Sequence, residues 1–181
     1  MKHEQQQRDG MPLETVVNDD CSLRVLRPDD AERIFEILQA DSDISTKYVT
    51  WLAGATSAED IAERTADFNS RKALRYAIVA DGTLVGYVGA WQHHFDPESA
   101  EYDLGYFCDP QYRGQGLVTA STNHLMDLLV QHMNAQSFAL YINDHNTGSQ
   151  AVAKKLGYTR TEETGTDRTL GVDERRWEKR A

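Results

Sequence analysis

The stretch Gln111-Tyr112-Arg113-Gly114-Gln115-Gly116-Leu117 decides the fold, because it links a strand pattern to a helix pattern through a glycine-bearing loop. Residues 102–108 precede it with the pattern of a strand, and residues 117–133 follow it with the pattern of a long helix. Glycines let the backbone approach a ligand closely, and the N–H groups at a helix N-terminus carry partial positive charge. The loop therefore predicts a pyrophosphate site, with a plain strand-to-helix connection as the alternative.

The spacing of the glycines separates this loop from two other phosphate-binding loops. The order is Gln-x-x-Gly-x-Gly, whereas dinucleotide-binding folds carry Gly-x-Gly-x-x-Gly. The Gly-Lys-Ser or Gly-Lys-Thr ending of a P-loop does not follow either. Both of these nucleotide-binding classes are therefore excluded at this loop.

Length and charge limit the classes of protein to which the chain can belong. The 181 residues suit one domain, and a chain of this size folds without disulfides or a metal. The net charge of −10 argues against nucleic-acid and anionic-membrane partners. The sequence has no apolar run near ~18 residues and no apolar signal core, and Cys21 and Cys108 lie far apart. These features predict a protein of the reducing cytoplasm.

The hydrophobic periodicity predicts a flexible leader over residues 1–20 and one mixed α/β domain over residues 21–181. Asp81-Gly82 is typical of a tight hairpin between two strands. The predicted strands cover 22–27, 74–80, 83–91, 102–108, 137–143, 158–163 and 172–179. Four helices are predicted: one opening at Pro28, one behind the capping-box pattern at 57–60, one over 117–133, and a short one ending near Lys155.

Three separated motifs carry a resemblance to the GNAT superfamily of N-acetyltransferases. They are Asp103-Leu104-Gly105-Tyr106-Phe107, the glycine loop, and Asn146-Thr147-Gly148-Ser149 with Leu156-Gly157-Tyr158 behind it. Together with the early segment 24–30, they resemble the RimJ/RimL-like branch of that superfamily. The resemblance implies the GNAT fold, a central mixed and mostly antiparallel sheet of about seven strands flanked by about four helices.

The resemblance also implies a reaction. Acetyl-CoA would be the cosubstrate, and the acetyl group would pass to a primary amine by direct attack in a ternary complex. The acceptor would be a protein N-terminal α-amine or a small amine, and the protein could form a homodimer. An antibiotic or polyamine acetyltransferase and a non-catalytic acyl-CoA-binding module are the alternatives. Neither the acceptor, the oligomeric state nor the preferred acyl length follows from the sequence.

The resemblance assigns the cofactor-binding residues to two segments. The backbone of residues 113–116 would hold the pyrophosphate, and the strand 107–109 would hydrogen-bond the pantetheine arm. The implied cofactor-binding residues are Phe107, Cys108, Asp109, Arg113, Gly114, Gln115, Gly116, Leu117, Val118, Asn146 and Ser149.

Acetyl transfer needs a base for the amine and a proton for the departing thiolate. Asp103 is the first candidate base and Glu101 the second, because residues two apart on a strand share one face. Their alternative role is a solvated pair of acids. Many GNAT enzymes carry a tyrosine acid at the position of Ala153, so Ser149 becomes the candidate donor here, with helix capping as its alternative role.

No metal site is predicted. His93 and His94 are adjacent, so on a strand they would point to opposite faces and could not chelate one ion. Cys108 at a strand end is typical of a small buried hydrophobe, which disfavours a covalent acetyl-enzyme.

Overall fold

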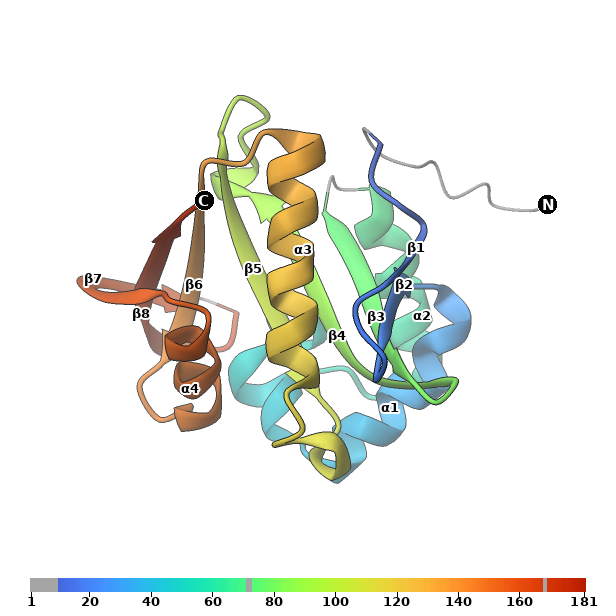
Figure 1. Ribbon diagram of the computed structural model, residues 1–181. Helices are drawn as coiled ribbons and strands as arrows, with labels where there is room; N and C mark the ends of the chain where they lie inside the picture. The colour runs from blue at the N-terminus through green and yellow to red at the C-terminus, as the bar shows by residue number, and fades with distance from the viewer. Residues whose placement is uncertain (1–9, 71–72, 168) are drawn as a thin grey trace.

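The computed structural model describes residues 10–70, 73–167 and 169–181, with side chains except those of 67–70. Its strands form one sheet in the order β1-β2-β3-β4-β5-β6-β8-β7 (Figure 1). The strands are β1 (Glu14–Val16), β2 (Ser22–Val25), β3 (Leu74–Ala80), β4 (Thr83–Gln92), β5 (Glu101–Cys108), β6 (Ser137–Asn143), β7 (Thr159–Asp167) and β8 (Val172–Arg180). The helices are α1 (Ala31–Ala40), α2 (Ala58–Ser70), α3 (Leu117–Met133) and α4 (Thr147–Lys155). Short helical turns are η1 (Pro28–Asp30), η2 (Ile44–Tyr48), η3 (Thr50–Leu52), η4 (His93–Phe95) and η5 (Pro110–Tyr112).

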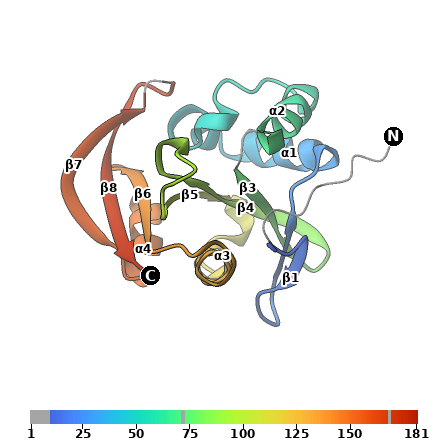
Figure 2. The same cartoon turned by 90° about the horizontal axis from the view of Figure 1, so that it is seen from above.

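The helices cover both faces of the sheet, with α1 and α2 on one face and α3 on the other (Figure 2). Each face has its own buried cluster. Leu104 and Tyr102 of β5 pack in the cluster on the α3 side, and Phe107 packs in the cluster on the α1 side. Because successive side chains of a strand point to opposite faces, Asp103 faces the same side as Phe107.

The pairing between β5 and β6 is the feature that opens the sheet. These two strands run parallel and pair only from Glu101–Ser137 to Asp103–Ala139. Beyond that point they diverge toward the end of the molecule where α4 begins (Figure 1). All other neighbouring strands are antiparallel. The separation leaves the second half of β5 with one open backbone edge.

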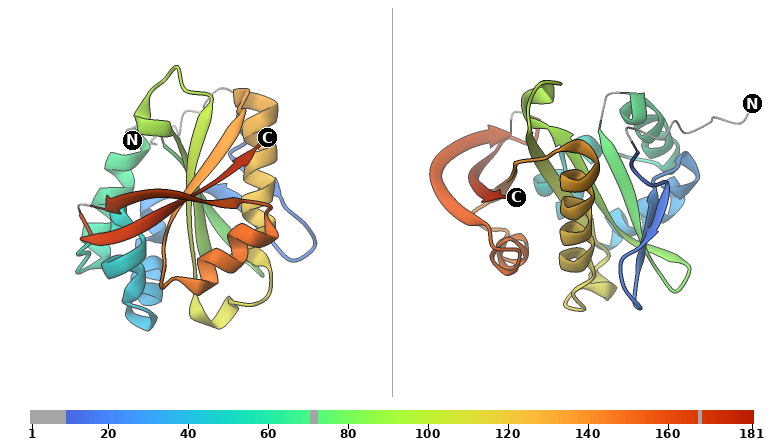
Figure 3. Two further views of the ribbon diagram at one scale, coloured as in Figure 1. Left: turned by 90° about the vertical axis from the view of Figure 1, so that its left-hand side faces the viewer. Right: turned by 45° about the horizontal axis from the view of Figure 1, so that its top comes forward.

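The hairpin of β7 and β8 crosses the direction of the central strands (Figure 3). Its turn reaches the helical turns that follow α1, where the hydroxyl of Thr50 contacts the carboxylate of Asp167. The sheet therefore curls at this edge, and the start of β8, where Val172 pairs with Asp167, lies near η3.

The structure differs from the expected leader over residues 1–20. Residues 14–16 form β1 and pair with β2, and Met11 is buried in the core at 1% exposure. A three-residue edge strand has too few residues to show a hydrophobic period, which is why the sequence pattern missed it. The fold therefore begins before Cys21, and residues 1–9 of the expected leader lie outside the described residues.

The mixed α/β fold predicted from the sequence is confirmed, with eight strands in the described part of the chain in place of about seven. The predicted bounds of β3, α3 and β6 match the structure. Among the described residues, no helix is both long and apolar enough to cross a membrane.

Candidate active site

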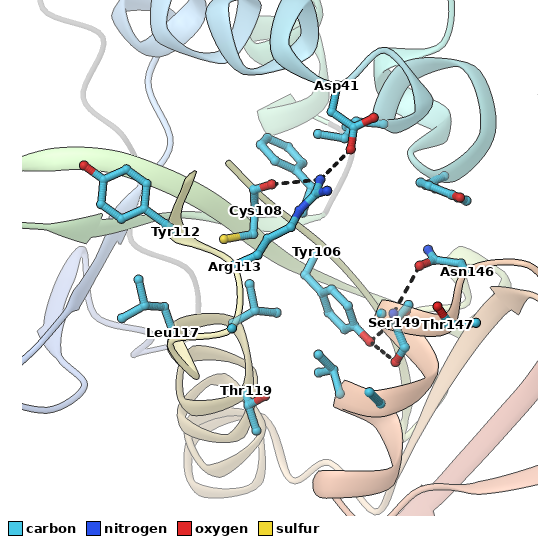
Figure 4. A pocket seen from close by; sticks show the side chains of 18 of the residues that line it. Asp41, Tyr106, Cys108, Tyr112, Arg113, Leu117, Thr119, Asn146, Thr147 and Ser149 are labelled. Atoms are coloured by element: carbon cyan, nitrogen blue, oxygen red, sulfur yellow. Dashed lines mark hydrogen bonds and ion pairs between the residues drawn. The ribbon is translucent and has the colours of Figure 1, made fainter. Parts of the chain in front are cut away.

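A cavity of about 490 Å³ lies between the end of β5, the glycine loop and the start of α4 (Figure 4). Most of the predicted cofactor-binding residues line it, namely Phe107, Cys108, Arg113, Gly114, Gly116, Leu117, Val118, Asn146 and Ser149. The other two predicted residues, Asp109 and Gln115, are not among the described residues that line the cavity. The separated sequence motifs therefore meet around one hollow.

The glycine loop ends in an uncapped helix. Gly114 and Gly116 have φ of 77° and 79°, a left-handed conformation that glycine adopts without the Cβ penalty. Gly116 is the N-cap residue of α3 and supplies no side-chain acceptor to the first turn. The first N–H groups of this 17-residue helix thus have no side-chain cap, and they belong to Leu117, Val118 and Thr119, which line the cavity. An anion in the cavity would meet these groups and the positive end of the helix dipole.

The open edge of β5 provides a second row of polar groups. The N–H of Asp109 donates to the carbonyl of Val85, so backbone groups of odd-numbered residues face β4. Those of Tyr106 and Cys108 consequently face the gap left by β6, where the guanidinium of Arg113 donates to the Cys108 carbonyl at 3.2 Å. An extended ligand with amide groups can pair with this edge.

Asp109 supports the loop with its side chain and does not line the cavity. Its carboxylate accepts from the Gln111 N–H at 2.9 Å and pairs with Arg33 of α1. Arg113 similarly bridges the loop to Asp41 at 2.6 Å, just beyond α1. These contacts fix the glycine loop against α1.

Tyr106 and Ser149 meet at the inner wall of the cavity (Figure 4). Their hydroxyl oxygens lie 2.9 Å apart, and the Tyr106 hydroxyl also donates to the Ser149 carbonyl at 3.2 Å. Burial raises the pKa of Tyr106 to about 12, so its hydroxyl keeps its proton at neutral pH. Asn146 is the N-cap of α4 and accepts from the Ser149 N–H, which leaves the Ser149 hydroxyl free of the capping role. Tyr106 lies within one of the three sequence motifs, but no pattern in the sequence predicts a role for it.

The two predicted bases lie together with His93 where β5 and β6 still pair. The Asp103 carboxylate is 2.9 Å from Nδ1 of His93, and burial raises the pKa of Asp103. Glu101 pairs with Arg176 at 2.8 Å and accepts from Ser137, and the Arg176 guanidinium lowers the pKa of Glu101. Neither acid is among the described residues that line the cavity.

The expected geometry of the two histidines is wrong. His93 and His94 lie in the turn η4, where His94 has φ of 55°, and their rings are 3.8 Å apart instead of on opposite faces. Nδ1 of His93 and oxygens of Glu101 and Asp103 lie within 4.8 Å of one another. Arg176 also pairs with Glu101, so these side chains form an ion-pair network with it. The absence of a metal stays a prediction.

Replacing Glu101 with glutamine is expected to lower the free energy of unfolding by about 2 kcal/mol at pH 7, between the values for exposed and buried ion pairs. Since the pKa of Glu101 is lowered, this contribution is present above its ordinary value of 4.5 and is lost as pH falls. Urea unfolding at about pH 7 and at several lower pH values measures it, and the difference between the variant and the wild type should shrink as pH falls below 4.5 and vanish below the lowered pKa. A difference that persists in acid would contradict the ion-pair explanation.

Comparisons with known proteins agree with this geometry. The family model described as "Acetyltransferase (GNAT) domain" matches residues 21–159. YdaF of Bacillus subtilis (strain 168), provisionally named a ribosomal N-acetyltransferase, is 25% identical over 150 residues, covering 78% of this chain and 79% of YdaF.

Two solved structures share the fold. One is the acetyl transferase that modifies the N-terminal serine of 50S ribosomal subunit protein L7/L12 from Salmonella typhimurium, with a TM-score of 0.79 and 17% identity. It is matched over 93% of this chain and 99% of that chain. The other is Mycobacterium smegmatis RimJ in complex with CoA-disulfide, with a TM-score of 0.72 and 18% identity over 89% of this chain and 82% of that chain.

The resemblance to RimJ/RimL-like acetyltransferases is confirmed by these matches. The cavity, the uncapped helix and the open edge of β5 suit an acyl donor with a phosphate-bearing end and an amide-bearing arm. The chain belongs to the GNAT acetyltransferase family, whose members transfer an acetyl group from acetyl-CoA to a primary amine.

Proposed function

We propose that this enzyme acetylates the N-terminal α-amine of a protein by direct attack in a ternary complex. The observation that carries the proposal is the Tyr106–Ser149 hydroxyl pair at the inner end of a cavity with a glycine loop at its outer end. YdaF and the Salmonella enzyme, whose names or titles refer to ribosomal proteins, support a protein acceptor.

Each part of acetyl-CoA has a fitting wall in the cavity. The pyrophosphate fits the loop at residues 113–116, and the pantetheine amides fit the open edge at Tyr106 and Cys108. In this binding mode the thioester lies beside Asn146 and Ser149. Gln115 contributes only its backbone in this proposal, and Asp109 acts indirectly by supporting the loop, since neither lines the cavity.

The hydroxyl pair supplies the proton that the departing sulfur needs. The Tyr106 hydroxyl carries its proton at neutral pH, and the Ser149 hydroxyl lies 2.9 Å away to relay it. Ala153 is fully buried and has no donor, so the pair replaces the tyrosine that many relatives carry there. A working donor weakens the alternative of a non-catalytic acyl-CoA-binding module.

Asp103 and Glu101 both stay predicted bases. Of the two, Asp103 is the better candidate base, because burial raises its pKa. The Arg176 guanidinium lowers the pKa of Glu101 and engages its carboxylate in an ion pair. The cytoplasmic location also stays a prediction, supported by two free cysteines. The homodimer expected from the resemblance is likewise a prediction.

A panel of amines tests the proposed acceptor. Peptides with free N-terminal serine, alanine or methionine are compared with the same peptides blocked at the N-terminus, and with spermidine and an aminoglycoside. Release of CoA thiol and a mass increase at the α-amine are expected for the free peptides alone. Transfer only to spermidine or the aminoglycoside would support the small-amine alternative. Acetyl-CoA binding without any transfer would support the non-catalytic alternative.

A further inference from the structure

A second, smaller cavity of about 50 Å³ lies behind the Tyr106–Ser149 pair. It shares four lining residues with the large cavity, namely Tyr48, Tyr106, Asn146 and Ser149. The other walls come from Leu104 and Gly105 of β5, from β6 and from β8. Its volume suits one or two waters or a primary ammonium group. The two cavities therefore meet where the thioester is placed by the proposed function.

Glu174 is the only carboxylate among the described residues that line this second cavity. It lies at the start of β8, opposite Asn143 of β6 and Gly165 of β7. Gly165 has no side chain to cover Glu174 from the β7 side. The carboxylate thus comes from a strand far from the glycine loop in the sequence, because α3, β6, α4 and β7 lie between them.

We propose that Glu174 binds the acceptor ammonium in the small cavity and removes its proton before attack on the thioester. This inference rests on the proposed function and deepens it by naming the base. It competes directly with Asp103, which lines neither of the two cavities.

The charges around Glu174 suit this role. Burial and, to a smaller extent, the negative charge of Asp167 on β7 together raise the pKa of Glu174 to about 7. Tyr48 of η2 and Tyr141 of β6 line the same cavity, and Arg176, next but one on β8, is engaged by Glu101 and by the Tyr141 hydroxyl. A carboxylate with a pKa near neutrality can both accept the amine's proton and release it to solvent.

The protons and bonds balance with these groups alone. The ammonium gives one proton to Glu174, and the neutral nitrogen then attacks the thioester carbonyl. The new C–N bond forms as the C–S bond breaks, and the sulfur takes a proton from the Tyr106–Ser149 pair. The second proton of the amine nitrogen restores that pair, and Glu174 returns its proton to water.

The test compares Glu174→Gln with Asp103→Asn and with Glu162→Gln, a control acid on β7 that is 94% exposed. Glu174→Gln is expected to lower kcat/KM about 100-fold at pH 7 and to remove the rise in kcat/KM near pH 7. Acetyl-CoA affinity should change less than about twofold, and Glu174→Asp should restore part of the rate with a shifted profile.

A second readout needs no acceptor. Because the pKa of Glu174 is raised from its ordinary value of 4.5 to about 7, the folded state loses stability as pH rises between these values, and the loss levels off above about pH 7. The thermal midpoint of the wild type should therefore fall relative to Glu174→Gln as pH rises from about 5 to 7, whereas Glu162→Gln should follow the wild type.

Three results would overturn the inference. The first is that Glu174→Gln keeps the wild-type dependence of kcat/KM on pH. The second is that the rise in kcat/KM near pH 7 is lost only in Asp103→Asn. The third is that Glu174→Gln loses affinity for acetyl-CoA. If the wild type acetylates no α-amine peptide, the proposed acceptor fails separately. The kinetic test then uses whichever amine releases thiol, and a thermal midpoint that does not separate with pH overturns the inference without any acceptor.

Discussion

Replacement of Gly114 with valine is expected to weaken acetyl-CoA binding by about 100-fold, or about 2.7 kcal/mol. A Cβ at Gly114 meets no protein atom within 4 Å, so the added side chain projects into the cavity instead of the core. It would fill the space where the pyrophosphate must approach the N–H groups of residues 113–116. Calorimetric titration with acetyl-CoA measures the loss.

The matched control for this change is Gly82→Val in the hairpin between β3 and β4. Gly82 has φ of 75°, close to the 77° of Gly114, and its Cβ would also meet nothing within 4 Å. Both variants therefore carry similar backbone strain, of about 1–2 kcal/mol. Gly82 lies outside the cavity, so its variant should bind acetyl-CoA as the wild type does. Equal affinity losses in both variants would show that strain, not the ligand site, explains the effect.

The parts of the fold with a long hydrophobic period could be predicted from the sequence. The bounds of β3, α3 and β6 follow from mainly apolar runs or helical spacing sustained over seven or more residues. β1 has three residues and η3 has three, too few to repeat either period. Short elements of this kind matter to the site, because another of them, the five-residue turn η2, contributes Tyr48 to both cavities.

Most residues that line the large cavity at the loop and the end of β5 could also be predicted, whereas those of the small cavity could not. The loop and the end of β5 are contiguous in the sequence, so one motif carries their local geometry. Glu174 reaches the site through the register of β8 against β6, which no local pattern encodes. The pairing of β8 with β6 also brings Arg176 to Glu101. The alternation of side chains along β5 predicts only that Glu101 and Asp103 share one face, so it could not show which of them is the better base.

Replacement of Ser149 with alanine is expected to lower kcat about 100-fold, with acetyl-CoA affinity within about threefold of the wild type. The helix α4 should be unaffected, because Asn146 supplies its cap and Ser149 donates only its backbone N–H to that cap. Thr147→Val is the control, since this exposed hydroxyl lines the same cavity in the first turn of α4. Stopped-flow or steady-state thiol release with an accepted amine measures the rates.

The same proton path predicts how Tyr106→Phe combines with Ser149→Ala. If Tyr106 supplies the proton and Ser149 relays it across the 2.9 Å contact, either change alone breaks the path. The double variant should then be less than about tenfold slower than the slower single variant, because residues that act as a unit are not additive. Multiplicative losses would mean that the two hydroxyls act independently. In that case Ser149 would be the donor by itself, and Tyr106 would serve to position α4 through its bond to the Ser149 carbonyl.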